Sequence, residues 1–281
     1  MPRNRATIVY LEANAVGHLM PAQDTTIARN RRARIARRVN EGGLEIVASP
    51  ILLEELAAIG VRNWPAHIRV LGYLRNIASP RVQLHPKDLI IRELRARHSL
   101  HRPGSRLNRS DSDELWKLVM DPQTVVEVTQ QAQEEAEEFL REQRTLRVEA
   151  KGELRKGTPP DDAVEPNVWL WWTGEPIEHI RYFAKKTAQS FGADSVGLEL
   201  QRMPALWRFN AYKAARIALM HSRREGGALQ KTDAADALHY ATAAYADVFV
   251  SDDGPLHRTA EIIPNLRRPI TLDDFDRDYL G

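Results

Sequence analysis

The chain of 281 residues contains no cysteine, so disulfides and thiolate metal sites are both excluded. The same absence agrees with a reducing compartment. No run of about 18 apolar residues could cross a membrane, and the apolar stretch that follows MPRNRA is too short for a signal peptide. We therefore expect a cytoplasmic protein without a membrane partner.

Two other common patterns are missing from the sequence. There is no repeat with a period of roughly 20 to 50 residues and no glycine-rich phosphate-binding loop, which excludes repeat architectures and the usual nucleotide-binding motifs. The formal net charge of +2 is too small to identify a nucleic-acid-binding protein. Because single domains usually have about 100 to 200 residues, the length predicts an insertion or a second lobe.

Carboxylates are present at both ends of one expected helix-strand unit, in the stretch TDAADALHYATAAYADVFVSDDGPL. Asp233 and Asp236 lie where the helix should begin, and Asp252 and Asp253 follow the short apolar run at residues 248–250. That run is β-branched and aromatic and ends in turn residues, which is typical of a buried strand. Ligands of open α/β sheets bind outside the carboxyl ends of the strands, so these acids are placed for chemistry.

A second group of acids follows from the first part of the chain. The β-type run at residues 8–11 ends at Glu12, and Asn14 comes two residues later. Further on, Ser49 and a proline after it predict the start of a helix. At about 100° per residue, Glu55 lies beside the apolar stripe of this helix and Glu54 points away.

Each of these acids also has a purely structural interpretation. Asp233 and Asp236 would cap a helix, and Asp252 and Asp253 would form a turn. Glu54 and Glu55 would be a solvated pair in the first turn of a helix, and Glu12 an ordinary residue at the end of a strand. The two histidines near the acids, His239 and His257, are interpreted as structural residues or substrate contacts.

Four motifs in order carry a resemblance: YLEAN, SPILLEEL, DALHYATAA and VFVSDD. Together they resemble the PIN-domain nucleases, and the match covers roughly the first 80 and the last 75 residues. The resemblance implies an α/β/α three-layer sandwich with a central parallel sheet, interrupted by an all-helical insertion. We expect the PIN-like domain to comprise residues 1–80 and 204–281, with the insertion at 81–203.

The resemblance also implies a function and a site. Family members use three or four carboxylates to hold one or two Mg²⁺ or Mn²⁺ ions, which prefer oxygen ligands, and cut single-stranded RNA. Carried over by position, the catalytic and metal-binding acids are Glu12, Glu55, Asp236 and Asp253. Asp252 is an alternative metal ligand, because the turn could present either acid. Asn14 and Ser251 match the polar residues that orient ligands or metal-bound water.

One departure from the family concerns Glu12, since the first acid of the motif is usually Asp. The longer side chain shifts a bound cation, and it supports the alternative of a catalytically silent RNA-binding or protein-interaction module. Many relatives are toxins held in check by a partner protein, or defence and RNA-processing factors. The sequence leaves the choice among these roles open, and it also leaves open whether the chain forms a homo-oligomer.

Basic residues are concentrated in one expected helix, at residues 24–39, which contains six arginines. Such a face could neutralise RNA phosphates and give salt-dependent binding, for which we single out Arg31, Arg34 and Arg38. The alternative is a solvated helix paired with acids of the insertion.

The remaining segments are mostly helical in pattern. We expect helices at residues 86–97, 111–120, 122–156 and 204–224. A linker is expected at 157–166, a local aromatic core at 168–172 and a last strand at 269–272.

Overall fold

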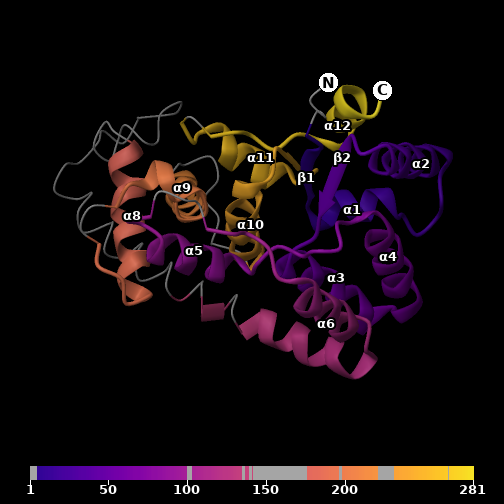
Figure 1. The fold of residues 1–281 in the computed structure, drawn as a ribbon, viewed down its shortest axis with the longest axis horizontal. Helices are drawn as coiled ribbons and strands as arrows, with labels where there is room; N and C mark the ends of the chain where they lie inside the picture. The colour runs from indigo at the N-terminus through magenta and orange to yellow at the C-terminus, as the bar shows by residue number, and fades with distance from the viewer. Residues whose placement is uncertain are drawn as a thin grey trace.

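The computed structural model describes residues 5–99, 103–134, 137–138, 141, 176–195, 198–220, 231–264 and 266–281. The chain is mixed α/β and mostly helical, with a small parallel sheet at its centre (Figure 1). Its strands are β1 (Thr7–Leu11), β2 (Leu44–Val47) and β3 (Val248–Val250). The α-helices are α1 (Ala13–Leu19), α2 (Thr26–Asn40), α3 (Pro50–Arg62), α4 (Trp64–Ile77), α5 (Pro86–Arg95), α6 (Arg109–Val119), α8 (Pro176–Ser190), α9 (Pro204–Met220), α10 (Lys231–Thr242), α11 (Gly254–Glu261) and α12 (Leu272–Tyr279). Two short 3₁₀ helices are η3 (Leu200–Arg202) and η4 (Ala243–Tyr245).

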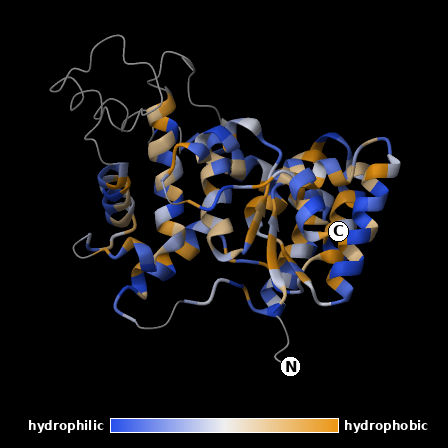
Figure 2. Cartoon of the chain, turned by 90° about the horizontal axis from the view of Figure 1, so that it is seen from above, coloured by the Kyte–Doolittle hydropathy of each residue, from blue (hydrophilic) through white to orange (hydrophobic). Residues whose placement is uncertain are grey.

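The sheet has the strand order β2-β1-β3, and both pairings are parallel. Thr7 lies opposite Leu44 and Val9 lies opposite Val248. All three residues of β3 are buried, as expected of a parallel strand covered on both faces, and the strands are among the most hydrophobic elements (Figure 2). The parallel sheet is thus confirmed, and the carboxyl ends of its three strands meet at one edge.

Most expected helices are present with small shifts at their ends. The helix predicted after Ser49 is α3, in which the Ser49 hydroxyl accepts a hydrogen bond from the Leu52 amide and Pro50 occupies the first position. The sequence analysis did not identify β2 or α4. A turn at Gly42, with φ of 73°, leads into β2. A strand of four residues such as β2 is too short for its hydrophobic pattern to be recognised in the sequence.

Two hydrophobic clusters form the core. The first surrounds the sheet, α3, α4 and α6, and the second lies among α5, α8 and α9. Helix α10 lies between them (Figure 1), because Tyr240 belongs to the first cluster and Ala241 to the second. Residues of the expected insertion enter both cores, with Trp116 in the first and Phe183 in the second. The expected boundaries at 80/81 and 203/204 stay predictions.

The strand expected at 269–272 is reduced to a single bridge between Ile270 and Val250. The extended chain stops there because Thr271 caps α12, accepting a hydrogen bond from the Asp274 amide. Residues 122–134 of the long charged helix are helical. The expected linker at 157–166 and aromatic core at 168–172 lie outside the described residues.

Candidate metal centre

The carboxyl edge of the sheet brings together chemical groups from four separate stretches of the chain. Glu12 follows β1, Ser49 follows β2, and Ser251 follows β3, while α10 contributes Asp236 and His239. The Glu12 amide donates a 3.0 Å hydrogen bond to the Val250 carbonyl, so the ends of β1 and β3 are held side by side. The position of these groups follows directly from the parallel order of the strands.

Three of the side chains form a group that could hold a metal ion. One ligand atom each from Glu12, Glu55 and His239 lie within 4.8 Å of one another. Glu12 is 6% exposed and His239 is fully buried. The Nε2 atom of His239 lies 2.8 Å from Oε2 of Glu55. Two carboxylates and one imidazole are a donor set suited to a divalent cation.

The orientation of the His239 ring is fixed by a hydrogen bond at Nδ1, the ring nitrogen that does not contact Glu55. Its Nδ1 lies 2.5 Å from the Tyr10 hydroxyl, which in turn lies 2.9 Å from the Ser49 hydroxyl. Histidines that bind metals usually donate their second ring N–H to an oxygen, which fixes the tautomer. With Nδ1–H donating to Tyr10 and Tyr10 donating to Ser49, a metal ion would take the place of the proton on Nε2, the nitrogen that faces Glu55. The residues present therefore fit a metal ion.

A third acid, Asp236, extends the cluster along α10. It is 7% exposed, and its Oδ2 accepts a 2.8 Å hydrogen bond from the buried hydroxyl of Tyr212. Burial raises the pKa of Asp236 to about 8, with the Tyr212 hydrogen bond opposing this shift and Asp253 adding to it. Asp253 is thus close enough to repel Asp236, and the two acids share one electrostatic environment.

The pKa values of Glu12 and His239 are also shifted by burial and by the charges of the cluster. Burial raises the pKa of Glu12 to about 7, against the attraction of His239 and together with the repulsion of Glu55. Burial lowers the pKa of His239, but Glu55, Glu12 and Asp236 outweigh it and raise that pKa to about 9. Without a metal, the cluster holds extra protons because its negative charges are crowded. A divalent cation would neutralise the same charge.

Ser251 and Asn14, expected to orient ligands, both hold the loop after β3. The Ser251 hydroxyl donates to Glu12 Oε2 at 3.0 Å and accepts from the Asp253 amide at 3.1 Å. Asn14 Oδ1 accepts from the Asp252 amide at 3.0 Å. Ser251 therefore positions a candidate ligand directly, whereas Asn14 acts on the backbone of the loop.

The two neighbouring aspartates of this loop have different surroundings. Asp252 Oδ1 accepts from the Leu272 amide at 2.8 Å, and its Oδ2 lies 2.6 Å from Nδ1 of His18. Asp253 Oδ1 caps α11 by accepting from the Leu256 amide at 2.7 Å. Of the two, Asp253 contributes to the raised pKa of Asp236, which favours Asp253 as the acid of the cluster and Asp252 as a structural residue of the loop.

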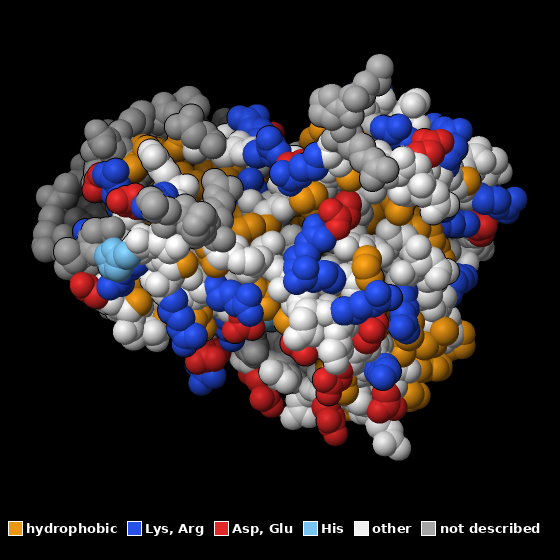
Figure 3. Space-filling model, viewed as in Figure 1, with side chains coloured by type: hydrophobic (Ala, Val, Ile, Leu, Met, Phe, Trp, Pro, Cys, Tyr) orange, Lys and Arg blue, Asp and Glu red, His pale blue; other side chains and the backbone are white. Residues whose placement is uncertain are grey.

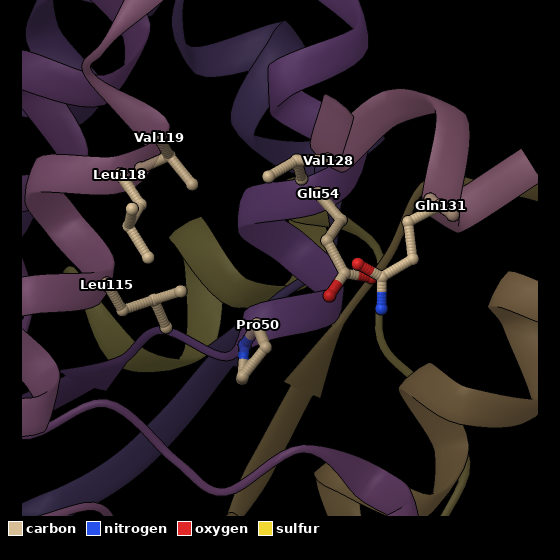
Figure 4. Close-up of a pocket in the computed structure, with 8 residues that line it drawn as sticks. Pro50, Glu54, Leu115, Leu118, Val119, Val128 and Gln131 are labelled. Atoms are coloured by element: carbon tan, nitrogen blue, oxygen red, sulfur yellow. The ribbon is translucent and has the colours of Figure 1, made fainter. Parts of the chain in front are cut away.

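The adjacent glutamates of α3 also separate as their helical positions predict. Glu55 reaches His239, whereas Glu54 lies beside Gln131 at a different pocket, with a volume of about 170 Å³ (Figure 4). The rest of that pocket is mostly apolar and includes Leu115 and Val128. A substitution of Glu55 therefore changes the cluster, and the same substitution of Glu54 is its control outside the cluster.

The arginines of α2 have intramolecular partners in α12. Arg31 forms ion pairs with Asp273 and Asp276, and Arg34 Nη2 lies 2.6 Å from Asp276 Oδ2. Arg38 lies 3.9 Å from Glu41. Figure 3 shows acidic and basic side chains intermixed over this region. Arg31 and Arg34 thus pair with the C-terminal helix and Arg38 with the end of α2 itself, whereas the alternative predicted acids of the insertion as partners. RNA binding by these arginines stays a prediction.

His239 is the candidate ligand that the sequence analysis did not select. Its spacing of three residues from Asp236 places both on one face of α10, which was the available signal. The hydrogen bonds from Tyr10 to His239 and from Tyr212 to Asp236 could not be predicted, because no sequence pattern links these tyrosines to the site.

Comparisons with family models, curated proteins and solved structures found no match to this chain. Among the described residues, there is no helix with the length and apolar character needed to cross a membrane.

Proposed function

We propose that the chain is a PIN-like, metal-dependent endoribonuclease that hydrolyses phosphodiester bonds of single-stranded RNA. In this proposal Glu12, Glu55, Asp236 and His239 hold Mg²⁺ or Mn²⁺, and Asp253 completes the negative cluster. The three-layer α/β/α sandwich of that family is part of the same proposal. The observation that carries it is the buried group of carboxylates and imidazole at the carboxyl edge of a parallel sheet.

The chain's own residues would position the reacting groups. When bound, a divalent ion lowers the pKa of a water molecule and neutralises charge that builds on the phosphate. Ser251 holds Glu12, Tyr212 holds Asp236, and Tyr10 fixes the ring of His239. These hydrogen bonds keep the ligands in place before substrate arrives, which avoids reorganisation during the reaction. No nucleophilic side chain is required.

The imidazole favours one of the two metals. Mg²⁺ is bound almost entirely by oxygen, whereas imidazole suits later divalent metals, and Mn²⁺ binds more tightly than Mg²⁺ when a nitrogen ligand is present. Because His239 faces Glu55 within the cluster, we expect Mn²⁺ to support cleavage at lower concentrations than Mg²⁺.

The test uses the two neighbouring glutamates of α3. Purified protein is incubated with a labelled single-stranded RNA in Mn²⁺, Mg²⁺ or EDTA, and cleavage is followed on gels. Glu55→Gln and Asp236→Asn should lower Mn²⁺ affinity by at least about 10- to 100-fold, the loss seen when only a residue that supports a ligand is removed, and abolish cleavage at low Mn²⁺. Glu54→Gln removes the same charge one position away and should cleave like the parent. Cleavage by Glu55→Gln at the parent rate would contradict the proposal.

The second candidate function is a catalytically silent PIN-like module that binds RNA or a protein. Glu12 favours it, because the side chain is longer than the usual Asp, and so does the engagement of Asp253 in capping α11. Mn²⁺ binding in the parent without any cleavage would support this candidate. If Glu12→Asp then gained cleavage, the extra methylene would be the cause.

The biological role is part of the proposal as well. A toxin should arrest growth when expressed alone, with an antitoxin-like partner relieving the arrest, and Glu55→Gln should remove it. Growth arrest that persists in Glu55→Gln would mean that the proposed chemistry is not responsible.

A further inference from the structure

Two arginines outside the proposed metal centre bind the short segment between α10 and β3, and a third arginine is adjacent to one of them in sequence. Arg208 of α9 donates to the Ala243 carbonyl at 2.7 Å, and Arg267 donates to the Asp247 carbonyl. Arg268, next in sequence, donates to the Glu261 carbonyl at 3.4 Å. Arg208 and Arg267 thus bind the two ends of residues 243–247, so their charges lie close together.

These arginines differ from those of α2 in their partners. Arg208, Arg267 and Arg268 donate only to backbone carbonyls, and within the described ranges none of them pairs with a carboxylate. Burial lowers the pKa of Arg208 to about 10, with Tyr240 raising it and Arg267 lowering it. At neutral pH Arg208 still carries its charge. A half-buried guanidinium beside a second one, without an anion, is an electrostatic cost that an anion would remove.

A tyrosine beneath the arginines carries a hydroxyl that lacks a partner. Tyr240 is fully buried, and its hydroxyl makes no hydrogen bond among the described residues. Burial raises the pKa of Tyr240, and Arg208 and Arg268 are among the charged groups that oppose this rise. Arg208 binds the Ala243 carbonyl, only three residues after Tyr240 in the chain, which places its guanidinium beside the end of α10 that carries this tyrosine. An unpaired buried donor costs about 1 to 3 kcal/mol, and an acceptor supplied by a ligand would recover it.

We propose that Arg208, Arg267, Arg268 and the Tyr240 hydroxyl form a phosphate-binding site. The chemistry fits, since guanidinium groups bind phosphate oxygens through paired N–H donors and a phenol adds one more donor. Arg267 and Arg268 are exposed and Arg208 is half-buried, so the site opens to solvent and closes towards Tyr240.

The location suggests which phosphate is bound. Tyr240 lies four residues after Asp236 on α10, a rise of about 6 Å along the helix axis, and Asp236 is among the groups that raise the pKa of Tyr240. A strand with its scissile phosphate at the metal centre would have other phosphates within reach of the arginines. Assigning the ligand as RNA rests on the proposed function, whereas the phosphate site itself does not.

The experiment measures binding without chemistry. A fluorescently labelled single-stranded RNA is titrated against the full chain in EDTA at several salt concentrations, with inorganic phosphate as a competitor. The double variant Arg267→Gln with Arg268→Gln and the single variant Tyr240→Phe should each weaken RNA affinity, the double variant by about tenfold or more. The double variant should also reduce the slope of log affinity against log salt by about 0.7 for each lost contact.

The matched control removes two arginines elsewhere. Arg62 and Arg69 are exposed on α3 and α4, and the double variant Arg62→Gln with Arg69→Gln makes the same change in net charge. It should bind RNA with an unchanged affinity to within twofold. Equal losses in the two double variants would overturn the proposal, because net charge alone would then explain them.

Two further measurements are made. The melting temperature separates a loss of binding from a loss of stability, and direct phosphate titration identifies the ligand. Tyr240→Phe should leave the melting temperature unchanged or raised, because it removes an unpaired donor. Direct titration with inorganic phosphate supports a free-phosphate ligand if Arg268→Gln weakens phosphate binding but not RNA binding. Unchanged binding of both probes in all variants would overturn the site. RNA binding in EDTA, together with no cleavage of the same RNA in Mn²⁺, would refute only the proposed nuclease function.

Discussion

At the scale of single residues, Glu12, Asp236 and His239 share one crowded environment, and each has a pKa above its ordinary value. Burial is the main cause for Glu12 and Asp236, and repulsion from neighbouring carboxylates adds to it. For His239, the surrounding negative charges outweigh the effect of burial. A proton and a divalent cation are thus alternative ways of relieving the same repulsion.

The pH dependence of stability follows from the sign of these shifts. The pKa rises on folding from 4.5 to about 7 for Glu12, from 3.8 to about 8 for Asp236 and from 6.5 to about 9 for His239. Over this window the unfolded chain binds fewer protons than the folded one, so the free energy of unfolding falls as pH rises. In EDTA, the melting temperature should therefore drop between about pH 5 and pH 9.

Added Mn²⁺ should reverse that drop. The stabilisation by the metal should grow with pH, because the ion competes with protons for the same ligands. Calorimetry at several pH values, with EDTA and with Mn²⁺, measures both effects. Glu12→Gln cannot titrate at that position and should show a shallower decline in EDTA. Curves of parent and variant that run parallel in EDTA would contradict the assignment of this group.

At the scale of elements, the arginines of α2 show how charge can serve the fold. The side chain of Asp276 is 16% exposed and accepts from both Arg31 and Arg34, which ties α12 to α2. A surface ion pair contributes about 0 to 1 kcal/mol to stability, and disruption of a buried pair costs about 3 to 5 kcal/mol. For a partly buried pair of this kind we expect a contribution between these two values. The basic face of α2 is thus partly neutralised by the chain itself.

We expect the double variant Arg31→Gln with Arg34→Gln to lower the free energy of unfolding by about 1 to 3 kcal/mol, because Asp276 loses both partners. Urea unfolding measures this loss. The salt slope of RNA binding should stay the same, in contrast to the variant of Arg267 and Arg268. A reduced slope with unchanged stability would instead support the RNA-contact role expected for α2 from the sequence.

At the scale of the whole molecule, α10 joins two cores, and one glutamate ties α5 to α9 and η4 within the second core. Glu93 of α5 is 2% exposed. Its carboxylate accepts from the Ala205 and Leu206 amides at 2.9 Å and from the Tyr245 hydroxyl at 2.7 Å. A side chain from the expected insertion therefore caps α9, satisfying two amides that a helix start leaves unpaired.

Glu93→Ala should destabilise the whole chain by about 2 to 5 kcal/mol, since it leaves several buried donors unpaired. Tyr245→Phe removes one of these donors together with its bond and should cost about 0.5 to 1.5 kcal/mol. Unfolding followed by circular dichroism and by tryptophan fluorescence should give one coincident transition in the parent. Two separate transitions would show that the segment at 81–203 folds independently.

The sequence by itself determined those features that depend on neighbouring residues. The apolar runs at residues 8–11 and 248–250 became strands, and Ser49 with Pro50 began α3 as their local chemistry requires. The 100° rotation per residue was enough to separate Glu55 from Glu54. Strand order then placed the acids at one edge, which is why the candidate site was largely visible in the sequence.

The tertiary structure alone decided which distant groups became partners. His239 and Glu55 are 184 positions apart, and Arg34 and Asp276 are 242 apart. No local periodicity specifies such pairs, because they depend on how whole helices pack against the sheet and against each other. The strand β2 was likewise decided by the tertiary structure. So short a segment gains its strand conformation from pairing with β1 more than from its own sequence.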